Sequence, residues 1–402
     1  MAMAEHRPPL PLVLFVIGNV LFATGLIVHA FLYNFYLEAL GVSATVMGHA
    51  AAALTAGSLV TLIPGGVLAD RTGPRTTVIT GALVLSVGLC LGALATSPLA
   101  VYGAAAIAGI GSGFWRVAMA PVLMRLTQPR TRARAFAWNV GLLAAWNGVG
   151  VWVGGAASTW LEARWGLPRL TALRATLLAG AAGSAASLLL YRALQLRPDP
   201  PSPGAAPVAA APVDSHLARE ILPLIGLLTV WMVGPALCVQ FLNIFFSHAH
   251  RFSIERVGLL FAAASWCWAL AVLASGEMAN RIGVRRVLFA SLLAFAPAIW
   301  GLSLAPSVGL AVGLYFVQGL IAPVATPLID QWLLGQAPPE RQGAVSSWRQ
   351  VAADVSAMVG ASFGGHLLAA SSFRALFLVA GAIGFVGALG VIASTRARAT
   401  RR

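Results

Sequence analysis

Two charged side chains, Arg116 and Asp354, lie deep inside long apolar stretches of the sequence. From Arg116 to Arg125, toward the end of its stretch, the distance along a helix would be roughly 13 Å at 1.5 Å per residue. Asp354 lies at a similar depth, and no other acidic residue falls near the middle of an apolar stretch. A lone charge in such surroundings is costly, so each needs a partner or a water-filled cavity. Pairing with an arginine lowers a carboxylate's pKa and desolvation raises it, so we expect the two residues to act together in reversible proton binding.

Five further residues belong to this candidate set. Asp330 and Arg349 are shallower in neighbouring stretches, where a structural ion pair is the favoured interpretation. Trp115 could line an aromatic cavity or pack in a core. Asn34 and Asn243 occupy nearly equivalent places, 209 residues apart. They could contact a ligand or cap a helix end, and the sequence favours neither.

The composition is that of a membrane protein. The chain has 402 residues, of which 59% are hydrophobic and 9% charged, and its mean hydropathy is +0.84. Soluble domains are about a quarter charged, so we predict a polytopic, all-α membrane protein. Its three cysteines lie in apolar runs without metal-ligand spacing, which indicates buried small side chains.

Apolar runs of about 20 residues predict twelve transmembrane helices. The first run is too long for a secretory signal and ends in aromatic residues, which indicates a retained helix. The predicted helices cover residues 10–37, 44–67, 76–96, 99–124, 135–160, 170–191, 219–247, 255–276, 286–304, 307–333, 344–369 and 373–394. Between the sixth and seventh lies a Pro/Ala-rich linker, residues 196–217, separating domains 1–195 and 218–402.

A short charged segment, Gly65-Gly66-Val67-Leu68-Ala69-Asp70-Arg71-Thr72-Gly73-Pro74-Arg75, interrupts the apolar pattern. Gly73 suits the left-handed turn that ends a helix, and Pro74 prevents its continuation. A degenerate copy, Gly276 to Arg286, follows 210 residues later with a neutral asparagine in place of the aspartate. This pattern resembles the loop between the second and third helices of the major facilitator superfamily, echoed between the eighth and ninth. The resemblance covers the whole chain and is specific for the fold but not for the substrate.

The resemblance implies two six-helix bundles related by a pseudo-two-fold axis along the membrane normal, with a central cavity. It also implies that the loop gates the cytoplasmic side, with Asp70 approaching the helix that starts near Ser346 when that side closes. The implied gating residues are Gly66, Asp70, Arg71, Gly73 and Arg75, with Asn280, Arg281, Gly283 and Arg285 in the second copy.

The function implied by the resemblance is secondary active transport of a small organic solute by alternating access. Proton-coupled export is favoured by a partial export signature, Gly150-x-x-x-Gly154-Gly155, in which Val151 replaces the usual proline. Proton-coupled or facilitated uptake of a small metabolite remains the alternative, because the first helix has no acid before Glu38. A non-transporting membrane receptor is a more distant alternative. The glycine spacing is equally that of close helix packing.

The charge distribution fixes the expected orientation. All 26 basic residues are arginine, and most fall on one side if both termini are cytoplasmic. This predicts a multi-pass protein of the cytoplasmic (inner) membrane, and it explains the +14 net charge without nucleic acid as a partner. The sequence has no nucleotide-binding glycine loop, nucleophile–base pair or metal-ligand cluster, so neither an enzyme nor a cofactor is expected. The expected partners are a small-molecule substrate, protons and the lipid bilayer, with the chain acting as a monomer. The histidines are peripheral, and both pH sensing and packing are open to them.

Overall fold

The computed structural model describes residues 9–196, 215–338 and 341–399, and it contains no β-strand in these ranges. Within them, eleven helices are long and apolar enough to cross a membrane, and a bent pair of helices would make twelve. The protein is therefore an all-helical membrane protein, as the hydropathy predicted. The Pro/Ala-rich part of the predicted linker, residues 197–214, lies outside the described residues.

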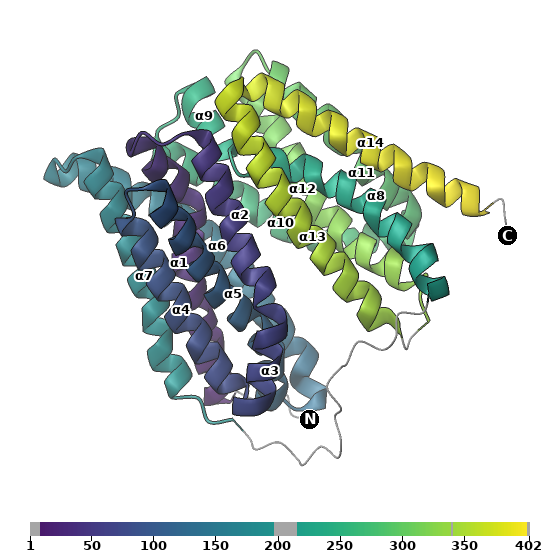
Figure 1. Cartoon of the computed structure of the whole chain (residues 1–402), viewed down its shortest axis with the longest axis horizontal. Helices are drawn as coiled ribbons and strands as arrows, with labels where there is room; N and C mark the ends of the chain where they lie inside the picture. Colours follow the sequence, from purple (N-terminus) through teal and green to yellow (C-terminus); the bar gives the residue numbers. More distant parts are fainter. Residues whose placement is uncertain (1–8, 197–214, 339–340, 400–402) are drawn as a thin grey trace, which may run out of the picture. The chain divides into compact units, whose positions relative to one another are not determined.

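The chain forms two compact units (Figure 1). Unit 1 comprises residues 1–41, 53–203 and 254–262, and unit 2 comprises residues 42–52, 204–253 and 263–402. Two helices are divided between the units: α2 (Ala44–Val60), after residue 52, and α10 (Ile254–Ile282), after residue 262.

The complete helices of unit 1 are α1 (Leu10–Ala39), α3 (Leu62–Thr72), α4 (Pro74–Leu94), α5 (Pro98–Leu126), α6 (Pro129–Trp165) and α7 (Arg169–Arg192). In this unit α4 packs against α5 and α1 packs against α7 and α6. Small residues allow the closest approach: a Cβ added to Gly88 of α4 would lie 2.3 Å from the backbone nitrogen of Ala108 on α5. Phe15, Phe22 and Leu85 are buried in the resulting core.

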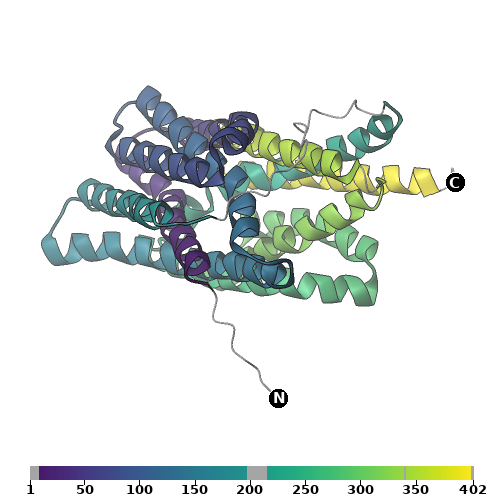
Figure 2. The ribbon, with the colours of Figure 1, turned by 90° about the horizontal axis from the view of Figure 1, so that it is seen from below.

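The complete helices of unit 2 are α8 (Ser215–Val239), α9 (Leu242–His250), α11 (Val284–Leu304), α12 (Val308–Leu334), α13 (Gln342–Ala370) and α14 (Phe373–Ala399). The last helix lies along α8 and also packs against α11 (Figures 1 and 2). Two indole N–H groups form hydrogen bonds between these helices, each 3.0 Å long. Trp231 of α8 donates to the Leu292 carbonyl of α11, and Trp300 of α11 donates to the Leu378 carbonyl of α14.

The segment predicted as one helix over residues 44–67 is bent by 42° where α2 meets α3. The bend lies at Thr61, whose hydroxyl donates to the carbonyl of Gly57 at 2.6 Å and lies 3.0 Å from that of Ser58. A threonine that bonds back to the preceding turn competes with the helical amide bonds and bends a helix. Hydropathy does not register this bend, because the residues on both sides of Thr61 are apolar.

The prediction of one continuous helix over residues 219–247 was wrong. The chain leaves α8 after Val239 and resumes as α9 at Leu242. Pro235 has no N–H to donate to the carbonyl one turn before it, which weakens the helix just ahead of the break. The Phe241 amide then donates to the Cys238 carbonyl at 3.0 Å in a tight turn. This break lies just before Asn243.

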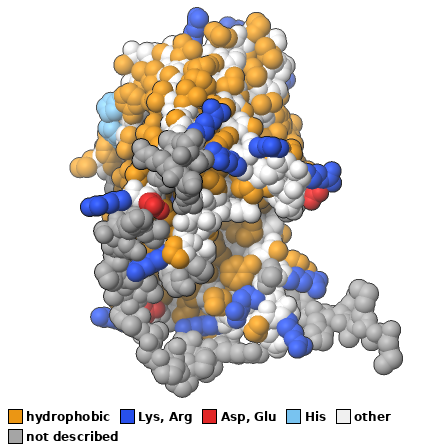
Figure 3. All heavy atoms as spheres, turned by 90° about the vertical axis from the view of Figure 1, so that its right-hand side faces the viewer, with side chains coloured by type: hydrophobic (Ala, Val, Ile, Leu, Met, Phe, Trp, Pro, Cys, Tyr) orange, Lys and Arg blue, Asp and Glu red, His pale blue; other side chains and the backbone are white. Residues whose placement is uncertain are grey.

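The surface of the described helices carries many large apolar side chains. Ile63 and Leu99 are each 81% exposed. On the face drawn in Figure 3, hydrophobic side chains cover much of the upper part, and arginines gather across the middle and lower parts. Such surface apolarity suits contact with lipid, because a soluble monomer rarely exposes large apolar patches.

Candidate functional site

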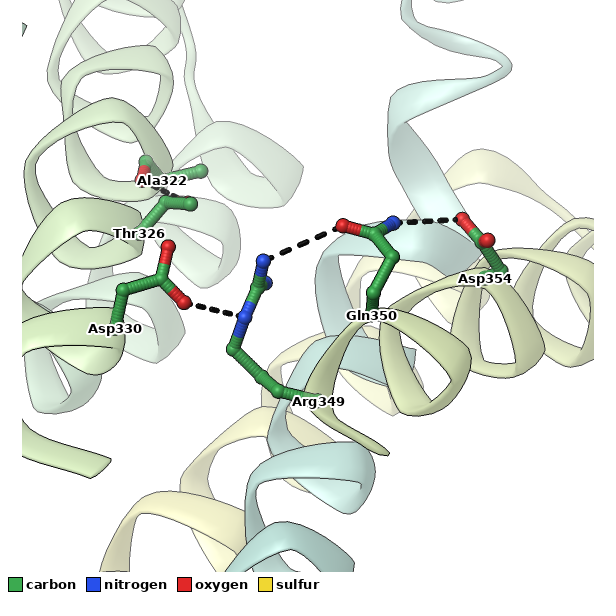
Figure 4. A network of polar contacts seen from close by, with 6 residues as sticks. All are labelled: Ala322, Thr326, Asp330, Arg349, Gln350 and Asp354. Carbon is green, nitrogen blue, oxygen red and sulfur yellow. Dashed lines mark hydrogen bonds and ion pairs between the residues drawn. The ribbon is translucent and has the colours of Figure 1, made fainter. Parts of the chain in front are cut away.

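Four side chains of unit 2 form a continuous polar network, drawn in Figure 4. The Arg349 guanidinium on α13 forms an ion pair with Asp330 on α12. It also donates from Nη2 to Gln350 Oε1 at 3.3 Å, and Gln350 Nε2 donates to Asp354 Oδ1 at 3.1 Å. The network thus runs from a half-exposed carboxylate to a buried one.

Asp354 is the innermost member, with 8% of its surface exposed. Its partner in the network is the neutral Gln350 amide, while Arg349 is bound to Asp330. The structural ion pair favoured for Asp330 and Arg349 is therefore present. Within this network, Arg349 is linked to Asp354 through the Gln350 amide.

In unit 1, Trp115 uses its polar atom inside the helix bundle. Its Nε1 donates to Asn19 Oδ1 on α1 at 2.9 Å. Its ring stacks on the Phe22 ring, with 4.9 Å between the ring centroids. Arg116, the next residue, is half-buried on α5. Because Arg116 belongs to unit 1 and Asp354 to unit 2, their joint action stays a prediction.

The Trp115 contact is part of a buried network that was not predicted from the sequence. Asn19 Oδ1 also accepts from the Tyr191 hydroxyl on α7 at 2.7 Å, and Asn19 Nδ2 donates to Asn139 Oδ1 on α6 at 2.7 Å. Both asparagines are fully buried. An uncharged amide within an apolar stretch was the available signal, since lipid-spanning helices place polar side chains in their interior.

The charged loop between α3 and α4 has the backbone that the sequence predicted. Gly73 has φ +88° and Pro74 opens α4. Arg75 reaches the end of α7, where it donates to the carbonyls of Tyr191 and Arg192. The Tyr191 carbonyl also accepts from the Leu194 amide at 3.3 Å, and a cation suits the negative end of a helix. Asp70 and Arg71 are exposed, and the space beside Gly66 is open within 4 Å.

The second copy of the loop shares the turn but not the side-chain contacts. Gly283 has φ +98° between α10 and α11. Arg281 pairs with Glu277 at 2.6 Å on the same helix face, and Arg285 lies over the Phe289 ring at 5.3 Å. Asn280 is exposed. The gating roles of both loops stay predictions.

The two asparagines predicted at helix ends have different surroundings. Asn34 is half-buried within α1, between the buried Tyr33 and Phe35. Asn243 is buried in the first turn of α9, and its Oδ1 accepts from the Ile244 amide at 2.9 Å. Asn243 is therefore at the break in the seventh predicted helix, not near its end. Broken membrane helices often supply polar groups to binding sites.

No group of three or more His, Cys, Asp or Glu side chains in the described ranges could hold a metal ion. The described network residues can hold protons and polar groups of an organic ligand, through carboxylate, amide and guanidinium groups.

A family model described as the Major Facilitator Superfamily matches residues 14–250 and 221–401. The chain belongs to the major facilitator superfamily. It is therefore a multi-pass membrane protein and a secondary transporter for a small molecule, and not an enzyme.

The similar curated proteins are matched over a short part of their length. The chain is 30% identical over 97 residues to the multidrug resistance protein MdtH of Yersinia enterocolitica and to that of Yersinia pestis. This alignment covers 24% of the chain and 23% of each relative.

Solved structures of superfamily members share the fold over nearly the whole chain. The nucleoside transporter NupG is 14% identical with a TM-score of 0.74, covering 96% of this chain and 98% of its own. A bacterial homologue of the lysosomal transporter Spinster, inward-facing and unoccupied, is 13% identical with a TM-score of 0.75, covering 97% and 99%. A bacterial homologue of the iron transporter ferroportin is 14% identical with a TM-score of 0.75, covering 96% and 98%. At these identities the similarity shows the fold.

Proposed function

We propose that this chain exports a small organic compound across the cytoplasmic membrane in exchange for protons, with Asp354 as the proton-binding residue. The observation that carries the proposal is the buried Asp354 carboxylate hydrogen-bonded to a neutral amide. The partial similarity to MdtH, a multidrug resistance protein, supports an organic compound as substrate and export as the direction.

The Gln350 amide can bond to Asp354 in both of its protonation states. An ionised carboxylate accepts the hydrogen bond from Gln350 Nε2. A protonated carboxyl retains one oxygen that can accept the same bond, and it gains a hydroxyl that can donate.

Arg349 and Asp330 position this proton site. Their ion pair holds the guanidinium beside Gln350 Oε1, which fixes the orientation of the Gln350 amide. The donor end of the amide is therefore directed at Asp354 Oδ1. In this proposal Arg349 and Asp330 act through Gln350, and the proton is carried by Asp354.

The orientation rests on the arginine distribution. The loops at Arg71, Arg75, Arg281 and Arg285 lie on the cytoplasmic side in this proposal, together with both termini. A proton enters Asp354 from outside and leaves it to the cytoplasm, and the organic compound moves outward in the other half of the cycle. Binding of either ligand must favour one conformation over the other for such coupling.

The test uses purified full-length protein in liposomes that carry a pH-sensitive dye inside. Transport of an added organic compound across the liposome membrane is measured with and without an imposed pH gradient. We expect gradient-driven transport by the wild type, and ligand binding without gradient-driven transport by Asp354→Asn. The matched control is Glu277→Gln, which removes an exposed carboxylate from a surface ion pair and should transport normally.

Two results would contradict the proposal. Asp354→Asn that retains the wild-type response to the pH gradient would exclude Asp354 as the proton carrier. Accumulation of the compound on the side to which the protons move would show uptake, the alternative direction, with the same residue free to carry the proton.

A further inference from the structure

Four glycines build two equivalent helix crossings. In unit 2, a Cβ added to Gly48 of α2 would lie 2.3 Å from the Ala361 carbonyl oxygen, and one added to Gly365 of α13 would lie 2.6 Å from that of Ala44. The helices therefore touch backbone to backbone, with small residues only at the contact.

The other crossing lies in unit 1 and is related to the first by the internal repeat. A Cβ added to Gly155 of α6 would lie 3.0 Å from the Ile254 carbonyl oxygen, and one added to Gly258 of α10 would lie 3.1 Å from that of Val151. Gly48 and Gly258 are 210 residues apart, as are Gly155 and Gly365. The two crossings are thus built from the same four positions of the repeat.

The crossings differ in the residues that follow the glycines. His49 and His366 face each other across the α2–α13 crossing, with their Nε2 atoms 3.0 Å apart and their ring centroids 4.8 Å apart. At the same repeat positions, the α6–α10 crossing has Leu259 and Ala156. One crossing therefore carries two titratable side chains where its counterpart carries two apolar ones.

A hydrogen bond between two imidazole nitrogens requires one N–H donor and one lone pair. Two neutral rings meet this requirement, and so does one neutral ring beside one protonated ring. Two protonated rings cannot, because every ring nitrogen is then a donor and two like charges meet at 3.0 Å. Histidine is the side chain that ordinarily changes charge between about pH 5 and 8.

Among the described residues of unit 2, the carboxylates lie away from this crossing. The remainder of α2 has no ionisable side chain. The described carboxylates of α8, α12 and α13 are Glu220, Asp330 and Asp354, which lie toward the Arg349 end of α13, while His366 lies in its last turns.

The groups nearer the His366 end add no negative charge. They are Cys238 on α8, His248 and His250 on α9, Tyr315 on α12 and Arg374 on α14. Burial lowers the pKa of His250, which favours the neutral form of its ring.

We propose that His49 and His366 form a pH-operated latch on the α2–α13 crossing. The latch holds while at most one ring is protonated, and it opens when both rings are protonated. This inference rests on the proposed transport function, because it makes the crossing a gate that separates during the cycle. In the proposed orientation the latch faces the outside, so external acid opens the path that admits protons.

The test measures the crossing directly, without a substrate. Spin labels are placed on exposed positions beside it, Ser43→Cys and Ser371→Cys, in full-length protein whose three native cysteines are replaced by alanine. Distances are measured by pulsed electron paramagnetic resonance in lipid nanodiscs from pH 8 to pH 5. We expect the short-distance population to fall as pH falls over this range.

Two variants remove the titratable contact in different ways. His49→Phe with His366→Phe leaves an apolar contact, and His49→Gln with His366→Gln leaves a neutral hydrogen-bonding one. We expect the distance to lose its pH dependence in both. The matched control labels the other crossing, with Ala163→Cys and Glu255→Cys, and should not respond to pH.

Three outcomes would overturn the latch: a pH-independent distance in the wild type, an equal response at the control crossing, or a response that survives in both histidine variants. The proposed function fails separately. A latch that opens with acid in a protein that moves no compound in liposomes would contradict the transport proposal and leave the latch standing.

Discussion

The side-chain amide of Gln350 donates a hydrogen bond of 3.1 Å to the buried Asp354 carboxylate, one turn further along α13. The same amide accepts from Arg349 at 3.3 Å. Gln350 therefore transmits the position of the Asp330–Arg349 ion pair to the proposed proton site.

Gln350→Leu should weaken both stability and proton coupling. It removes a donor from a carboxylate that is 8% exposed, and loss of a hydrogen-bond partner to a buried group costs about 1–3 kcal/mol. We expect a lower unfolding temperature in detergent and reduced gradient-driven transport. Gln331→Leu is the control, because Gln331 is exposed on α12 and should change neither quantity. Wild-type coupling in Gln350→Leu would show that the amide is dispensable.

Arg75→Ala should loosen the end of α7. The guanidinium donates to the Tyr191 and Arg192 carbonyls, and a cation at an exposed helix C-terminus contributes about 0.3–1 kcal/mol. We expect faster amide hydrogen exchange in residues 190–194. Arg71→Ala removes an exposed arginine of the same loop and should leave that exchange unchanged. Equal exchange in both variants would mean that the cap contributes no measurable stability.

Much of the fold followed from the sequence because one physical quantity, hydropathy, marks membrane-spanning helices. The charged loop added the turn at Gly73 and its copy at Gly283, since only a residue that tolerates positive φ suits those positions. The bend at Thr61 and the break after Val239 left no trace in hydropathy. Both arise from local hydrogen bonding within segments that stay apolar on either side.

The candidate site was predicted in part for a related reason. Depth in an apolar stretch singled out Asp354, and charge complementarity singled out Asp330 with Arg349. Gln350 was missed although its spacing of four residues from Asp354 places both on one helix face. Asn19 and Asn139 were missed because the sequence does not say which faces of α1 and α6 meet.

Asn19→Leu should be the most destabilising single change in the buried network of unit 1. It leaves the Trp115 N–H, the Tyr191 hydroxyl and the Asn139 amide without their shared partner. Each such group costs about 1–3 kcal/mol when buried unsatisfied, so we expect poor accumulation of folded protein.

Two variants that remove fewer hydrogen bonds should lower the unfolding temperature less. Thr24→Val removes the acceptor of a single indole, that of Trp146 at 3.0 Å, and should lower the unfolding temperature less. Tyr191→Phe removes one donor and leaves Asn19 bonded to Trp115, so its effect should be smaller again. Fluorescence-detected size exclusion and thermal melting in detergent measure the series. If Asn19→Leu unfolded at the same temperature as Thr24→Val, Asn19 would not be the shared partner of three groups.

Asp70→Asn should slow transport without lowering stability. Asp70 is exposed at the end of α3, so its charge contributes little to the folding of unit 1. A carboxylate that meets a helix N-terminus in another transport state would stabilise that state by about 0.3–1 kcal/mol, up to about 2 when partly buried. Its neutralisation therefore changes the balance of conformations, and we expect a lower turnover at unchanged melting temperature.

The second copy of the loop provides the matched comparison. Asn280 already occupies the place of Asp70 and is likewise exposed, so Asn280→Asp adds a charge at the equivalent position. If the charge acts only in the first copy, Asn280→Asp should leave turnover near the wild-type value. Initial rates in liposomes, normalised to the amount of folded protein, measure both variants. Equal losses in Asp70→Asn and Asn280→Asp would remove the asymmetry between the two loops and, with it, the assignment of the gate to Asp70.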